Sequence, residues 1–101
     1  MYEGCVAELR MLRNILEDGE YDDRSYICEI TELDEEEEKI HLLLREGDLK
    51  DISLDGIYEC VIKDKEEDLY CEGMIGERFV DTKGKNLTFF LENGFYKNSL
   101  N

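Results

Sequence analysis

Residues 47–64 read GDLKDISLDGIYECVIKD, in which a polar, turn-rich segment leads directly into the most strand-like run of the chain. From Ile57 to Asp64 apolar and polar side chains alternate, with Tyr58, Cys60 and Ile62 on the apolar side. Alternation with a period of two is the pattern of a strand that buries one face. The stretch therefore predicts a turn followed by the central strand of a sheet.

The residues after this strand predict further antiparallel strands. Leu69–Val80 returns beside it as the second strand of a hairpin, and Gly73 and Gly76 indicate a bulge or a tight bend there. Asn86–Glu92 is the next strand, and Asn93-Gly94 is a strong hairpin signal ahead of a last short strand. Bends of this kind curl a small sheet toward closure.

The residues before the central stretch contain a predicted hairpin with an acidic loop. Ser25–Leu33 and Lys39–Glu46 both alternate like strands, and the acidic run Asp34–Glu38 joins them. Its carboxylates could also hold calcium, but the run has neither the glycine turn nor the alternating oxygen spacing of a calcium loop. We therefore interpret it as an extended hairpin loop.

Residues 1–19 have a helical periodicity. Apolar residues recur there at intervals of four, three and four, at Cys5, Leu9, Leu12 and Leu16. This spacing places them on one face of an α-helix, which Gly19 would end with a left-handed conformation. A helix that covers an open end or face of the sheet is the favoured interpretation, and a partner-binding helix is the alternative.

Together these elements predict a mainly β protein with one N-terminal helix. The chain has the length of one domain, residues 1–101, in which residues 1–19 form the helix. Residues 24–98 form a small six- or seven-stranded antiparallel split β-barrel packed against that helix. An α+β two-layer sandwich is the alternative.

The charge balance restricts the kinds of partner. With 27 acidic and 12 basic residues, the formal net charge is -15. The basic residues are scattered among carboxylates, which argues against nucleic acid, whereas a protein partner with a basic surface fits the charge. Arg10 and Arg13 interrupt the N-terminal apolar segment, and no apolar run has membrane-spanning length. We therefore expect a cytoplasmic protein without membrane insertion, and the sequence leaves its oligomeric state open.

Patterns of catalytic and metal-binding residues are missing from the sequence. Its cysteines, Cys5, Cys28, Cys60 and Cys71, form no C-x-x-C pair, and His41 is the single histidine. We expect reduced cysteines that pack as small core residues and a histidine on the outer face of its strand. A cysteine-histidine nucleophile across the sheet is the alternative. The sequence thus predicts no enzyme, no metal site and no cofactor.

A series of motifs runs through Tyr26–Phe95. It consists of an apolar strand, a glycine turn, a Y-x-C-x-I strand and a small-residue strand that ends in an arginine-aromatic pair, in YICEI, KIHLLLREGDLKDISLDGIYECVIKD and LYCEGMIGERF. This order resembles the PilZ group of bacterial barrels, and especially the split barrel at the amino-terminal end of flagellar-brake proteins of that group. The resemblance implies a regulatory barrel that meets another protein.

Asp51, Ser53 and Gly56 match the D-x-S-x-x-G motif of ligand-binding PilZ domains residue for residue. In that family the motif and an upstream R-x-x-x-R segment together hold the second messenger cyclic di-GMP. Asp and Ser also close turns through backbone hydrogen bonds, and Gly56 would permit a positive dihedral before Ile57. A structural turn is the favoured interpretation, and a phosphate-contacting motif is the alternative.

The arginine pair of the family's ligand site is missing. Four residues after Arg10, Arg13 and Arg24 stand Asn14, Glu17 and Cys28. Paired guanidiniums supply the bidentate donors that two phosphates require. We therefore expect a non-enzymatic protein-interaction or regulatory module without its own cyclic di-GMP site. The alternative is a cyclic di-GMP effector in which these three arginines are irregularly spaced phosphate ligands.

Overall fold

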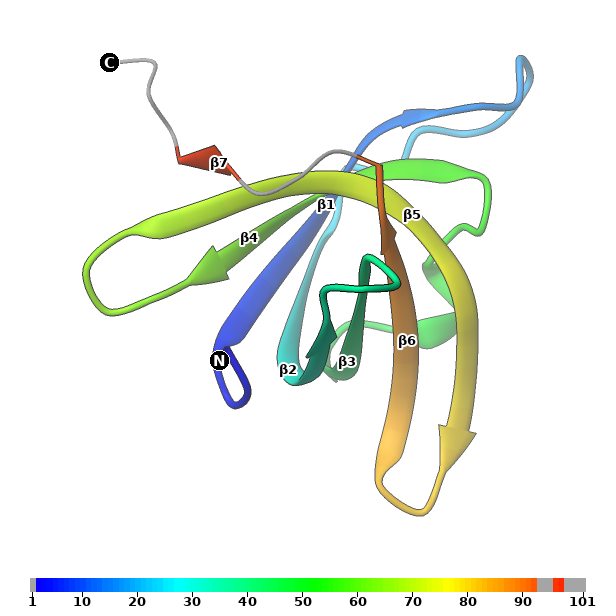
Figure 1. The fold of residues 1–101 in the computed structure, drawn as a ribbon. Helices are drawn as coiled ribbons and strands as arrows, with labels where there is room; N and C mark the ends of the chain where they lie inside the picture. The colour runs from blue at the N-terminus through cyan, green and yellow to red at the C-terminus, as the bar shows by residue number, and fades with distance from the viewer. Residues whose placement is uncertain (1, 93–95, 98–101) are drawn as a thin grey trace.

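The computed structural model describes residues 2–92, 96 and 97, which form seven strands and one turn of 3-10 helix, labelled η1 (Figure 1). The strands are β1 Val6–Asn14, β2 Ser25–Asp34, β3 Lys39–Glu46, β4 Gly56–Lys63, β5 Asp68–Asp81, β6 Gly84–Leu91 and β7 Tyr96–Lys97, and η1 is Leu49–Asp51. Within these residues no helix is long and apolar enough to cross a membrane.

Six of the strands close into an antiparallel barrel. Neighbouring strands follow the order β4-β1-β2-β3-β6-β5, and β5 also pairs with β4, which completes the ring. β7 adds to β5 through the pairs Leu69 with Lys97 and Tyr70 with Tyr96. The predicted antiparallel barrel is confirmed, and the two-layer alternative is wrong because the sheet closes on itself.

The predicted N-terminal helix is wrong. Residues 6–14 form β1 instead, which pairs with β2 on one side and with β4 on the other. Ala7, Leu9 and Met11 are buried, whereas Leu12 lies in a bulge and is 40% exposed. Helical and strand periods both fit this segment. The strand forms because its backbone groups find partners on both neighbours and so close the barrel.

Alternate side chains of the six barrel strands fill the interior. The inward positions predicted for β2, β3 and β4 are confirmed, because all of the following are buried: Tyr26, Cys28, Ile30, Ile40, Leu42, Leu44, Tyr58, Cys60 and Ile62. Phe89 of β6 packs among them. All four cysteines are free, and three are buried as expected, while Cys5 is half-buried.

β5 bends so that it can pair with two different strands. Its first half pairs with β4 up to Met74, and its second half pairs with β6 from Gly73 onward. The register against β6 shifts between Ile75 and Glu77, which confirms the bulge predicted at Gly76. Figure 1 shows β5 arching over the barrel. The predicted Asn93-Gly94 turn lies outside the described residues, and β7 pairs with β5 rather than with β6.

Candidate functional site

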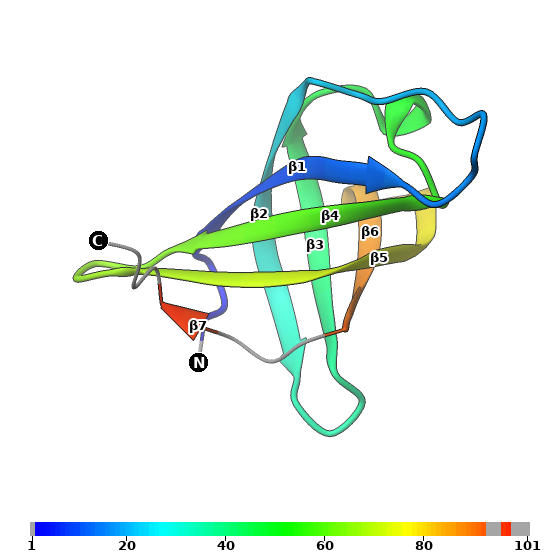
Figure 2. The ribbon, with the colours of Figure 1, turned by 90° about the horizontal axis from the view of Figure 1, so that it is seen from above.

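Two connections meet at one end of the barrel. Residues 15–24 link β1 to β2, and residues 52–55 link η1 to β4. The backbone N–H of Ile15 donates to the carbonyl of Asp55 at 2.9 Å, which ties the two connections together. Figure 2 shows the β1–β2 connection and η1 at this same end. The D-x-S-x-x-G motif therefore lies beside a segment whose first half, residues 15–19, the sequence had assigned to a helix.

Asn14 organises the β1–β2 connection. Its Oδ1 accepts the N–H of Leu16 at 2.9 Å, and its Nδ2 donates to the carbonyl of Glu20 at 3.2 Å. Gly19 packs against this side chain so closely that an added Cβ would lie 2.6 Å from Nδ2. Gly19 thus provides space rather than the left-handed helix end that the sequence predicted. The result is a connection with a defined conformation.

The two connections enclose a groove of about 310 Å³. We call it the acidic groove, because the carboxylates of Glu20, Asp22, Asp51 and Asp55 contribute to its lining. Among the described residues that line it, Arg24 is the single cation. Leu16 and Tyr21 add apolar surface and are both exposed.

Arg24 is held by two of these carboxylates. Its Nε donates to Oδ1 of Asp22 at 2.7 Å, and its Nη1 lies 2.9 Å from Oδ2 of Asp51. The hydroxyl of Tyr26 donates to the other carboxylate oxygen of Asp22. Burial alone would raise the pKa of Asp22, but the hydrogen bonds from Arg24 and Tyr26 outweigh it and lower that pKa. Burial of the Tyr26 hydroxyl, together with its hydrogen bond to Asp22, raises the pKa of Tyr26.

The motif residues form a turn. The backbone N–H of Ser53 donates to the hydroxyl of Tyr58 at 2.9 Å, and the Ser53 Oγ accepts the N–H of Asp55 at 3.0 Å. Gly56 does not have the positive φ that the sequence suggested. It is the first residue of β4, where an added Cβ would lie 2.8 Å from both Met11 Cε and Tyr58 Cε1. Gly56 is required for close packing.

The structure brings together only part of the alternative ligand set. Arg24, Asp51 and Ser53 line the acidic groove, whereas Arg10 and Arg13 do not. Both of these arginines are exposed on β1, where their backbones pair with β4. The groove consequently offers a phosphate one guanidinium, which already has two carboxylate partners.

The other sequence candidates are dispersed. Cys28, Cys60 and Cys71 are buried, whereas His41 alternates with buried neighbours on the outer side of β3, so no cysteine-histidine pair forms. Burial raises the pKa of Cys28 to about 12, and a hydrogen bond with Cys71 together with burial raises that of Cys60. The thiols of Cys28 and Cys60 are therefore poor nucleophiles.

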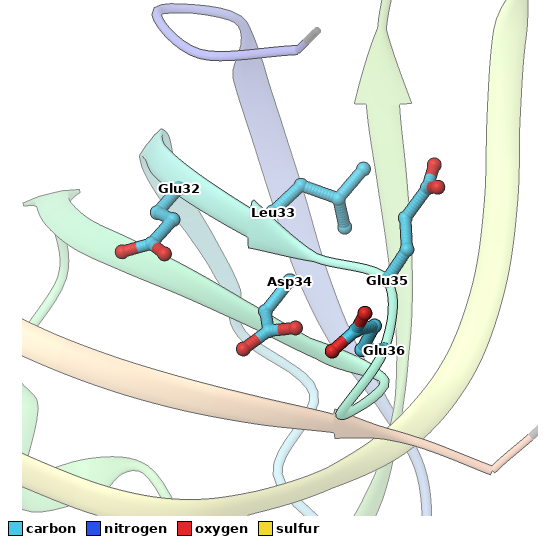
Figure 3. A pocket seen from close by; sticks show the side chains of 5 residues that line it. All are labelled: Glu32, Leu33, Asp34, Glu35 and Glu36. Carbon is cyan, nitrogen blue, oxygen red and sulfur yellow. The ribbon is translucent and has the colours of Figure 1, made fainter.

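The acidic β2–β3 loop has a hollow of about 460 Å³, lined by residues 32–36. Figure 3 shows its carboxylates pointing in different directions, with Glu32 and Glu35 on opposite sides of the loop. In the part of the chain that the structure describes, no group of three or more His, Cys, Asp or Glu is placed to hold a metal ion.

Apart from Arg24, the groove residues contributed by the β1–β2 connection were missed by the sequence interpretation. The helical spacing up to Leu16 concealed the connection, although the polar run EDGEYDDR, residues 17–24, is typical of a loop. Comparisons of the chain with protein-family models, with curated proteins and with solved structures returned no match.

Proposed function

We propose that this chain is a non-enzymatic protein-interaction module of regulatory type, similar to the PilZ-like bacterial barrels, and that it acts in the cytoplasm. The observation that supports this most directly is the β1–β2 connection. It has a defined conformation yet exposes large apolar side chains, including Ile15, Leu16 and Tyr21. Ordered loops that expose apolar side chains commonly serve as binding surfaces.

The same end of the barrel is poorly suited to cyclic di-GMP. The ligand carries two phosphates, and the acidic groove presents four carboxylates against Arg24. Arg24 would have to exchange its contacts with Asp22 and Asp51 for a phosphate while those carboxylates stayed nearby. The proposed module therefore has no cyclic di-GMP site of its own.

A calorimetric titration separates this proposal from the effector alternative, which the shared groove position of Arg24, Asp51 and Ser53 keeps open. We expect no heat of binding when cyclic di-GMP is added to the folded chain at high micromolar concentrations. Saturable heat that disappears in the Arg24→Ala variant would instead establish the effector function.

The interaction function is tested by photo-crosslinking in a bacterial lysate. A benzophenone amino acid replaces Tyr21 in one sample and Val80, an exposed residue of β5, in another. We expect discrete adducts with a protein partner, identified by mass spectrometry. If neither position gives an adduct at low or at high salt and the chain remains a monomer, the interaction function is wrong.

A further inference from the structure

We propose that the acidic groove docks a basic amphipathic segment of a partner protein, one that carries lysine or arginine side chains next to large apolar ones. This inference rests on the proposed interaction function and specifies its surface and the chemistry of the partner. Three features of the groove carry it: its unneutralised charge, its apolar border and its fixed conformation.

The charge of the groove selects a cationic partner. Arg24 forms salt bridges with Asp22 and Asp51, one positive charge against two negative ones. Among the described residues the carboxylates of Glu20 and Asp55 have no hydrogen-bond or salt-bridge partner. Both residues are exposed at the groove. Incoming lysine or arginine side chains would pair with them, and the net charge of -15 would accelerate the encounter.

Apolar surface distinguishes the groove from other acidic surface. Leu16 and Tyr21 line it, and Ile15 and Leu54 are exposed on the two hydrogen-bonded connections beside it. The hollow of the β2–β3 loop is also acidic, but Leu33 is its single apolar lining residue. Charge and apolar side chains therefore coincide at the groove, as an amphipathic segment requires.

The other exposed apolar patch has the wrong charge for such a partner. Phe79 and Val80 of β5 border a hollow of about 480 Å³ that Lys50 and Arg78 also line. The guanidinium of Arg78 donates to the carbonyls of η1, including that of Lys50 at 3.2 Å. Asp48 also lines this hollow, and its Oδ2 lies 4.0 Å from Nζ of Lys50, so the patch offers two cations and one carboxylate. It therefore lacks the excess of carboxylates that would attract a basic segment, which makes it a control surface.

The groove is already shaped before a partner arrives. Asn14 fixes the β1–β2 connection through two hydrogen bonds, the Ile15 N–H joins it to Asp55, and the Asp22 N–H contacts Met11 Sδ at 3.3 Å. A surface that is ordered in advance loses little conformational entropy on binding. The free energy gained by burying the exposed apolar side chains is therefore available for binding almost in full.

The test uses synthetic peptides and the ¹⁵N-labelled full chain. One peptide alternates lysine and leucine, a second replaces each leucine with serine, and a third replaces each lysine with glutamate. We expect the lysine-leucine peptide to shift the amide signals of residues 15–24 and 53–55. It should bind about tenfold more tightly than the lysine-serine peptide, because leucine burial adds to the charge contacts.

Paired variants then separate the groove from the rest of the surface. Leu16→Ser with Tyr21→Ser should weaken the lysine-leucine peptide about tenfold, whereas Phe79→Ser with Val80→Ser should not change its affinity. The two pairs are matched in exposure, at 48% and 61% against 46% and 69%. Glu20→Gln with Asp55→Asn should also weaken binding, whereas Glu35→Gln with Glu36→Gln should not.

Several outcomes would overturn the groove as the docking surface. They are equal binding of the lysine-serine peptide, equal binding of the glutamate-leucine peptide, and signal shifts centred on residues 32–38. Absence of binding by every peptide would likewise show that the groove does not dock a basic amphipathic segment. If photo-crosslinking from Val80 captures a partner while Tyr21 gives none, the interaction function stands and the groove is excluded.

Discussion

Gly73 and Gly76 of β5 allow a direct test of how the barrel closes. Neither glycine has a positive φ, so alanine can adopt the backbone conformation at both. At Gly73 an added Cβ would overlap the carbonyl oxygen of Phe90 and lie 2.9 Å from its carbonyl carbon. At Gly76 it would overlap the ring of Phe90, which is 36% exposed and can rotate into solvent. Gly73→Ala therefore clashes with backbone atoms, whereas Gly76→Ala clashes with a side chain that can move.

The two substitutions should differ by about 2 kcal/mol in the free energy of unfolding. Gly73→Ala forces β6 away from β5, and overpacking of this kind costs about 1–3 kcal/mol, to which weakened ladder hydrogen bonds add about 1 kcal/mol. Replacing glycine by alanine returns about 0.4–1 kcal/mol through the unfolded state. The net loss is roughly 2–3 kcal/mol. Gly76→Ala should stay within about 1 kcal/mol of the parent, since ring rotation mainly loses the Lys39–Phe90 cation–π contact.

Equilibrium unfolding in urea measures both values, and Phe90→Ala supplies the control. Removing the ring should abolish the remaining penalty of Gly76→Ala but leave that of Gly73→Ala unchanged, because the latter arises from the Phe90 backbone. Equal destabilisation by the two alanines, or rescue of Gly73→Ala by Phe90→Ala, would refute this account of how β5 meets β6.

Other predictions address β1, the groove and the cysteines. Ala7→Lys should lower the free energy of unfolding by roughly 3 kcal/mol or more because it buries a charge, whereas Leu12→Lys should lower it by about 1 kcal/mol or less. Urea unfolding of both variants distinguishes the strand from a helix. The lowered pKa of Asp22 contributes stability above its ordinary value of 3.8 that is lost as the pH falls through the lower folded pKa. Asp22→Asn should therefore flatten the loss of stability below about pH 4, with Asp23→Asn as the control, and an unchanged pH profile would contradict the assignment. Iodoacetamide at pH 8 should alkylate half-buried Cys5 in the native chain and all four cysteines in urea, as measured by intact mass; rapid native labelling of the buried thiols would contradict their burial.

The strands from residue 25 onward were predictable because their inward-facing residues recur with a period of two, although β4 also buries Ile57 and Val61 on its other side. A period of two over Tyr26, Cys28 and Ile30 has no helical counterpart, so the pattern identifies both the element and its inner side. Gly73 and Gly76 likewise predicted the bend in β5, since glycine inside a strand indicates a bulge or a close approach of another backbone.

Residues 5–16 were not predictable in the same way, because their apolar side chains satisfy two periods at once. Leu9 belongs to both, Leu12 and Leu16 favour a helix, and Ala7 with Met11 favours a strand. Only pairing with β2 and β4, which are distant in sequence, decides between them. At the site, the turn formed by Ser53 was predictable from local chemistry, whereas Gly56 is a glycine because Met11 and Tyr58 approach it.

The strand that the sequence concealed is also the element that creates the groove. β1 pairs with β2 only up to Arg10 and then continues along β4 as far as Asn14. The chain must therefore return across the end of the barrel to begin β2 at Ser25, and it does so beside the turn that precedes β4. Closure of the barrel and assembly of the acidic groove thus depend on the same stretch of β1.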